Sequence, residues 1–161
     1  SDLQRAAETG RILAEAANAP LYLDSRLREL NLGVFQGLTH AEIRERYAED
    51  EHQMQTAYMD HVVPEGESRR AMQSRIYEAW QEIVAGMDTQ PVALVSHGGA
   101  IRILLLRLLH PADHAQVMTL QITNTACTLL GVRPDGQVEM LIAADYSHLE
   151  RHTDGDGEHR L

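Results

Sequence analysis

The stretch Pro91-Val92-Ala93-Leu94-Val95-Ser96-His97-Gly98-Gly99 decides the fold class. Its first five residues are apolar and partly β-branched, a composition typical of a buried strand. The run Ala100–Leu109 that follows is rich in leucine, as a buried helix is. The stretch therefore indicates a buried strand that ends at a histidine and two glycines and turns at once into a helix.

Helices are also predicted on the amino-terminal side of this stretch. The sequence favours one helix up to about residue 17, one over 39–47 and a long one over 68–86. Residues 48–61 are polar and ambiguous, with a second helical piece as one interpretation. Side chains that cap helices stand at the three predicted starts, namely Ser1 or Asp2, then Thr39, whose partner in a capping box is Glu42, and then Ser68.

Two final strands, about Cys127–Val132 and Gln137–Ala143, flank the turn signal Pro134-Asp135-Gly136. The order of helix, strand, helices, strand, helix and hairpin is that of an α/β fold. We expect a three-layer sandwich with helices on both faces of a mostly parallel sheet. A single domain is predicted over 1–149, and 150–161 reads as a polar tail.

Composition narrows the classes of partner. The chain has 161 residues, 14 basic against 24 acidic, and a formal charge of −10, which argues against nucleic acid and anionic membrane as partners. The longest mostly apolar stretch is far shorter than the roughly 20 residues that cross a bilayer. The one cysteine, Cys127, lies in an apolar run and is predicted to be buried, which fits a reducing compartment and a cytoplasmic location.

An anion site is predicted where the strand meets the helix. Free backbone N–H groups and the positive end of a helix dipole converge beside His97, and Gly98 and Gly99 let a ligand approach the main chain closely. The alternative is that His97 is a hydrogen-bonded core histidine and the glycines only make a tight turn. The residues alone leave both interpretations open.

Two other side chains are candidates for this site. Arg5 lies in the first turn of a predicted helix, where the dipole disfavours a cation, so it is easier to explain if it faces an anion. Pairing with Glu8 is the alternative. Glu29 lies in a loop among apolar residues, where desolvation can turn a carboxyl group into a general acid. An ordinary surface ion pair with Arg26 or Arg28 is its alternative.

No metal site is predicted. His148 and His152 are four residues apart and acidic residues alternate in the tail, but the spacing fits neither a zinc nor a calcium motif.

Four motifs resemble the histidine phosphatase superfamily, the phosphoglycerate-mutase-like group, in order and spacing. They are Ser1–Thr9; Leu27-Arg28-Glu29 with Gly33 and Phe35-Gln36-Gly37; Gly66-Glu67-Ser68; and Val95-Ser96-His97-Gly98-Gly99. The similarity runs to about Leu149.

This resemblance implies an enzyme that moves a phosphoryl group from a small-molecule phosphate ester to a histidine, from which water then releases it. It implies Arg5 as a phosphate clamp and Glu29 as the proton donor to the leaving oxygen. His97 is implied as a second, phosphate-binding histidine with Gly98 beside it. No cofactor is implied, and a homodimer is left open as the assembly.

One family motif has no counterpart in the expected place. The nucleophilic histidine of the family stands in an Arg-His-Gly motif, but the single Arg-His pair here, Arg151-His152, is followed by Thr153. We expect the nucleophile and the first strand of the sheet to lie upstream of residue 1. The other interpretations are a circular permutation that uses His152 and a non-catalytic phosphoester-binding or regulatory relative. Because the segment Ala48–Val63 is short, hydrolysis is favoured over the transfer catalysed by a mutase.

Overall fold

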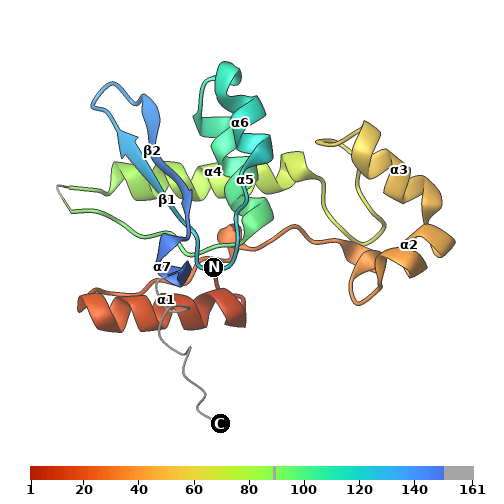
Figure 1. Cartoon of the computed structure of the whole chain (residues 1–161), viewed down its shortest axis with the longest axis horizontal. Helices are drawn as coiled ribbons and strands as arrows, with labels where there is room; N and C mark the ends of the chain where they lie inside the picture. The colour runs from red at the N-terminus through yellow and green to blue at the C-terminus, as the bar shows by residue number, and fades with distance from the viewer. Residues whose placement is uncertain (89, 151–161) are drawn as a thin grey trace, which may run out of the picture. The chain divides into compact units, whose positions relative to one another are not determined.

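The computed structural model describes residues 1–88 and 90–150, except the side chain of Glu150 (Figure 1). The chain divides into two compact units, Ser1–Arg107 and a second that begins at Leu108. Helices in the first unit are α1 (Gln4–Ala17), α2 (His40–Arg46), α3 (Ala48–Thr56), α4 (Arg69–Ala85) and α5 (Gly98–Leu108), with 3-10 turns η1 (Ser25–Leu27) and η2 (Gly33–Phe35). The second unit has η3 (Pro111–Asp113), α6 (His114–Thr119), β1 (Cys127–Val132), β2 (Val138–Asp145) and α7 (Ser147–Glu150).

The first helix is confirmed, but its predicted cap is wrong. Leu3 occupies the N-cap position, so no side chain caps the helix. The hydroxyl of Ser1 instead accepts a hydrogen bond at 3.3 Å from the amide of Leu3, the residue before the helix begins. The helix ends at Asn18, which adopts the left-handed conformation with φ 49°.

The other two predicted caps are confirmed. In α2 the Thr39 hydroxyl accepts from the Glu42 amide, and the Glu42 carboxylate accepts from the Thr39 amide at 2.8 Å, which completes the capping box. In α4 the Ser68 hydroxyl accepts from the Ala71 amide at 3.1 Å. The ambiguous region 48–61 contains a second helix, α3. None of the described helices is long and apolar enough to span a membrane.

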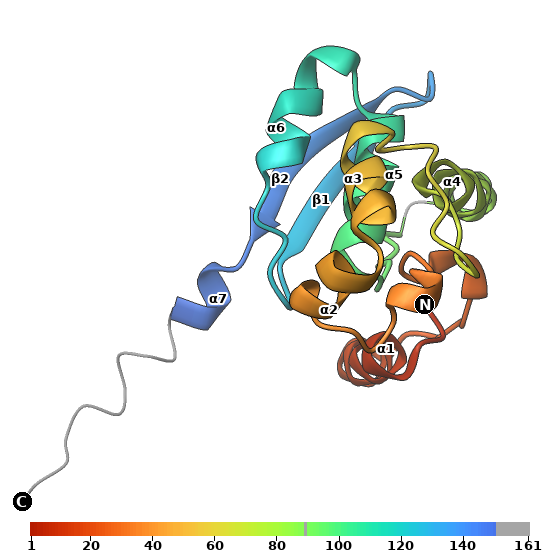
Figure 2. The same cartoon turned by 90° about the vertical axis from the view of Figure 1, so that its right-hand side faces the viewer.

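Most buried residues of the first unit lie on α1, α4 and α5. Figures 1 and 2 show the axes of α1 and α4 nearly aligned. The amide side chain of Gln73 on α4 donates to the Ile103 carbonyl of α5 at 3.1 Å, which ties these two helices together. The buried residues of the three helices are Ala6, Gly10, Met72, Ile76, Ala79, Ala100, Ile103, Leu104 and Leu105.

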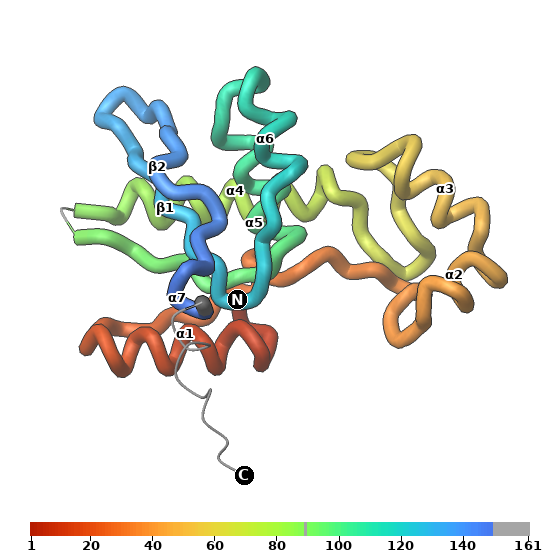
Figure 3. Tube along the Cα trace, in the orientation of Figure 1, coloured from red at the N-terminus to blue at the C-terminus, as the bar shows by residue number. Residues whose placement is uncertain are grey.

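A smaller apolar cluster holds the loop that follows the first helix. The backbone between α1 and α2 is mostly extended (Figure 3), and it buries Phe35 against Ile43 and Val63. The rings of Phe35 and Tyr47 lie 5.6 Å apart, in a tilted arrangement. This cluster anchors the loop at a point just beyond Glu29.

The mostly parallel sheet that the sequence predicts is not observed. Residues 91–97 are extended, but no strand pairs with them among the described residues, and Val92 is half exposed. A strand is stable only when a neighbour satisfies its backbone N–H and C=O groups, so this segment is extended without being a strand. The sheet found in the described residues is two-stranded and antiparallel.

That sheet is the predicted hairpin of the second unit. β1 has the predicted bounds, and β2 extends two residues beyond the predicted end. Gly136 has a φ of 83° in the turn, a conformation that glycine adopts without strain. The prediction of a buried Cys127 is wrong: this residue opens β1 and is exposed. The tail beyond 150 lies outside the described residues.

Candidate functional site

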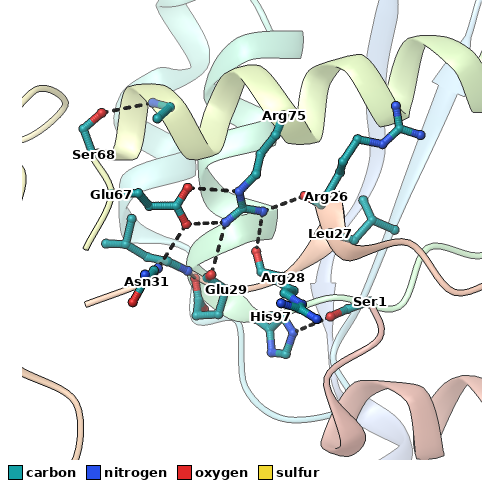
Figure 4. A network of polar contacts seen from close by, with 12 residues as sticks. Ser1, Arg26, Leu27, Arg28, Glu29, Asn31, Glu67, Ser68, Arg75 and His97 are labelled. Atoms are coloured by element: carbon teal, nitrogen blue, oxygen red, sulfur yellow. Dashed lines mark hydrogen bonds and ion pairs between the residues drawn. The ribbon is translucent and has the colours of Figure 1, made fainter. Parts of the chain in front are cut away.

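His97 lies at the junction between the extended segment and α5. Its carbonyl accepts from the Ile101 amide at 2.8 Å, which is the first helical hydrogen bond. His97 is 8% exposed, and its Nε2 lies 3.0 Å from the Ser1 hydroxyl (Figure 4). The preceding Ser96 donates to the Leu27 carbonyl at 2.8 Å. These contacts hold the imidazole and the first turn of α5 against the loop that carries Glu29.

The surroundings of His97 lower its pKa below 6.5. Burial is the largest cause, the positive charge of Arg5 adds to it, and the negative charge of Glu29 opposes it. The structure therefore brings three predicted site residues, Arg5, Glu29 and His97, within electrostatic range. A neutral imidazole beside a guanidinium group and a helix N-terminus is a favourable environment for an anion.

Arg5 is exposed on the first turn of α1 and borders an open concavity. No carboxylate pairs with it in the part of the chain that the structure describes. The alternative pairing with Glu8 is not observed, because Glu8 instead pairs with Arg11 at 2.6 Å. The Arg5 guanidinium thus has its donors available, and its charge acts on His97.

Glu29 is held by backbone groups. Its carboxylate accepts from the Gly99 amide at 3.0 Å and from the Leu30 amide at 2.8 Å. The alternative surface ion pair is not observed, because Arg28 pairs with Asp2, and Arg26 pairs with Asp24 and Glu82. Glu29 therefore lies against the first turn of α5, on the same helix end as His97.

Gly99 is needed for this approach. A Cβ atom at this position would lie 2.6 Å from Oε1 of Glu29 and 3.0 Å from Oε2. Any side chain at residue 99 would displace the carboxylate. The sequence predicted that Gly98 and Gly99 let a ligand approach the main chain; at Gly99 the group that approaches is the Glu29 carboxylate of the chain itself.

Sequence reasoning missed Arg75 and Glu67 as parts of the site. The Arg75 guanidinium donates to the carbonyls of Arg26, Arg28 and Glu29, and it pairs with the Glu67 carboxylate at 2.6 Å (Figure 4). Two signals were available. Glu67 belongs to the quoted Gly-Glu-Ser motif, and Arg75 interrupts the buried face of α4 beside Met72 and Ile76.

The described residues contain no group of three His, Cys, Asp or Glu side chains that could hold a metal ion. Nε2 of His148 lies 3.0 Å from the Thr125 hydroxyl. His152, the Arg151-His152 pair and the acidic tail lie outside the described residues.

An imidazole and a carboxylate thus lie at the start of α5, and the charge of the Arg5 guanidinium acts on the imidazole. Residues 1–145 match the histidine phosphatase superfamily (branch 1), and the chain belongs to this family. The solved structures it resembles show that the first unit and the hairpin are parts of the histidine phosphatase fold.

Three relatives illustrate the match. The chain is 34% identical over 109 residues to the probable phosphoglycerate mutase GpmB of Escherichia coli O1:K1 / APEC. The aligned region makes up 68% of this chain and 51% of the relative. Bacillus stearothermophilus YhfR superposes with a TM-score of 0.78 at 30% identity, over 92% of this chain and 73% of that protein. A mycobacterial glucosyl-3-phosphoglycerate phosphatase, in complex with inorganic phosphate, gives 0.72 at 32% identity, over 90% and 74%. The chain spans about half the length of the curated relatives it matches.

Proposed function

We propose that the protein hydrolyses small-molecule phosphomonoesters through a phosphohistidine intermediate. The observation that carries the proposal is that buried His97 and the Glu29 carboxylate meet at the start of α5, where the charge of Arg5 on α1 acts on His97. No Arg-His-Gly motif occurs in residues 1–161, so the nucleophilic histidine is assigned to a part of the protein upstream of residue 1.

The proposed roles follow from what phosphoryl transfer needs, which is positioning and neutralisation of the phosphoryl oxygens. Arg5 and His97 donate to these oxygens, together with the backbone N–H of Gly98. As the bond from phosphorus to the ester oxygen breaks and the bond to the histidine nitrogen forms, protonated Glu29 gives its proton to the leaving oxygen. The Glu29 carboxylate then takes a proton from the water that attacks phosphorus, the bond from phosphorus to the histidine nitrogen breaks, and inorganic phosphate leaves.

The names of relatives support the substrate class. One is a glucosyl-3-phosphoglycerate phosphatase whose structure contains inorganic phosphate, and another is named as a probable mutase. The short segment Ala48–Val63 favours hydrolysis over transfer within one substrate, because little chain is available there to close over a sugar phosphate. Location in the cytoplasm and a homodimer stay predictions.

The direct test uses the full-length protein that contains residues 1–161, with an aryl phosphate as substrate. We expect steady release of inorganic phosphate and an acid-labile phosphohistidine in quenched samples. His97→Ala and Glu29→Gln should each lower kcat by about 10²–10⁴-fold, the range typical of lost oxyanion donors and general acids. Wild-type rates in both variants would remove the assigned roles.

The second candidate is a phosphoester-binding protein without turnover. The absence of Arg-His-Gly from residues 1–161 is the observation that favours it. It predicts saturable binding of inorganic phosphate with no phosphate release from the ester. Turnover by the full-length protein would eliminate this candidate.

A further inference from the structure

We propose that Arg75 is a positioning residue: held by Glu67, it fixes the backbone around Glu29 so that the Glu29 carboxylate stays against the start of α5. This inference rests on the proposed function, because it assigns to Arg75 the placement of the general acid. Its central observation is that one guanidinium group on α4 binds three carbonyls of the loop that carries Glu29.

Arg75 binds backbone carbonyls at Glu29 and at residues that precede Glu29 in the chain. Nη1 donates to the carbonyls of Arg26 at 2.6 Å and Arg28 at 2.9 Å, and Nη2 donates to the carbonyl of Glu29 itself at 3.1 Å. The Arg75 side chain is only 22% exposed, so these bonds are largely shielded from water. A planar group with five fixed donors imposes one conformation on the loop.

Glu67 binds the loop backbone on the carboxyl-terminal side of Glu29, at Asn31. Its Oε1 accepts from Nη2 of Arg75 at 2.6 Å and from the Asn31 amide at 3.0 Å, while Oε2 accepts from Nε of Arg75 at 3.0 Å (Figure 4). The loop is therefore bound at Glu29 and again two residues later by a single ion pair.

The Glu29 carboxylate depends on this backbone because none of the described side chains binds it. Within the described residues, its hydrogen bonds come from the amides of Leu30 and Gly99. A shift of the loop would therefore carry the carboxylate away from α5. Misplacement of a reacting group by about 1 Å can cost about 10²-fold in rate.

A positioning role and a purely structural role predict different kinetics. A general acid matters most for esters whose leaving group is a poor one, such as an alkoxide, and least for those with an acidic phenol. Loss of Arg75 through global instability would lower both rates equally. Loss of positioning would lower the alkyl phosphate rate selectively.

The experiment compares kcat/KM for an alkyl phosphate and a nitrophenyl phosphate in the full-length protein. We expect Glu29→Gln to be selectively slow on the alkyl ester, and Arg75→Met to show the same selectivity with a loss of about 10²-fold. The double variant, Glu29→Gln with Arg75→Met, should be no slower than Glu29→Gln alone, because both changes remove the same proton donation. Arg75→Lys keeps the charge and the aliphatic stem but lacks the fork of donors, so it should show the selective loss in a folded protein.

Arg70→Met is the matched control. Arg70 also lies on α4 and also pairs with a carboxylate, Asp60, but the pair is exposed and binds no part of the Glu29 loop. We expect wild-type selectivity in this variant. A selective loss equal to that of Arg75→Met would overturn the inference.

The remaining outcomes separate the inference from the proposed function. If Glu29→Gln is selective but Arg75→Met and Arg75→Lys slow both esters equally, the positioning role is overturned and the general acid stands. If Glu29→Gln is not selective, or no turnover occurs, the general-acid assignment fails. The amide resonance of Gly99 then decides the positioning claim: it should shift in Arg75→Met as it does in Glu29→Gln, and an unchanged resonance would overturn the claim.

Discussion

Substitution of Gly99 by alanine probes the contact between Glu29 and α5 with a single methyl group. The added carbon would lie 2.6 Å from Oε1, 3.0 Å from Cδ and 3.0 Å from Oε2 of Glu29. These atoms are the far end of a flexible side chain, so the carboxylate moves and the helix backbone stays. The hydrogen bond from the Gly99 amide to Glu29, now 3.0 Å, is lost.

The expected cost in stability is small because two effects oppose each other. A hydrogen bond to a charged group contributes about 1.5–3 kcal/mol, less where the group is exposed as Gly99 is. Alanine in a helix gains up to about 1 kcal/mol over glycine. We expect a net loss of about 0.5–2 kcal/mol in the free energy of unfolding, measured by urea denaturation.

The effect on catalysis should be much larger. With Glu29 displaced, hydrolysis of an alkyl phosphate by the full-length protein should fall by about 10²–10⁴-fold, as expected when a general acid is removed. Gly86→Ala is the matched control, because a Cβ there meets its nearest atoms at an ordinary 3.5 Å. A folded Gly99→Ala protein with the wild-type rate on the alkyl phosphate would refute the reasoning.

Three further changes have defined outcomes. Arg5→Ala should raise the pKa of His97, because the charge of Arg5 lowers this pKa in addition to burial, and it should weaken phosphate binding. Arg11→Ala is the control on the same helix and should change neither property. NMR titration of the His97 ring with pH and with phosphate measures both. Because the folded-state pKa of His97 lies below 6.5, its contribution to stability is complete above pH 6.5 and is lost as the pH falls toward that lower value. Unfolding curves at about pH 7.5 and about pH 5.5 should therefore differ less in His97→Gln than in the wild type. Ser68→Ala should cost about 0.5–2 kcal/mol by removing the cap on the Ala71 amide, and an unchanged melting curve would contradict this.

Local signals in the sequence predicted local structure well. The capping box at Thr39, the cap at Ser68 and the hairpin around Gly136 each depend on residues within four positions of one another. Pairing of residues 91–95 into a sheet depends on a neighbouring strand, which composition cannot supply. The prediction of a mostly parallel sheet therefore went beyond what the described residues form.

The contacts around the candidate site were not predictable from the sequence. The pattern around His97 indicated an anion site, the local sequence and the family resemblance both singled out Arg5 and Glu29, and the roles of these residues stay predictions. The bond between Gly99 and Glu29 joins residues 70 positions apart, and the Arg75 contacts span 46 to 49 positions. A backbone carbonyl that accepts a hydrogen bond has no side-chain identity to mark it, so the role of Arg75 required the fold.

The most direct measurement of the central claim is a crystal structure of the full-length protein with orthovanadate, an analogue of the transferring phosphoryl group. We expect vanadate oxygens within about 2.6–3.2 Å of the Arg5 guanidinium and the His97 ring, with the Glu29 carboxyl near the oxygen in the leaving position. Vanadate bound elsewhere, or bound without contact to both Arg5 and His97, would contradict the central claim.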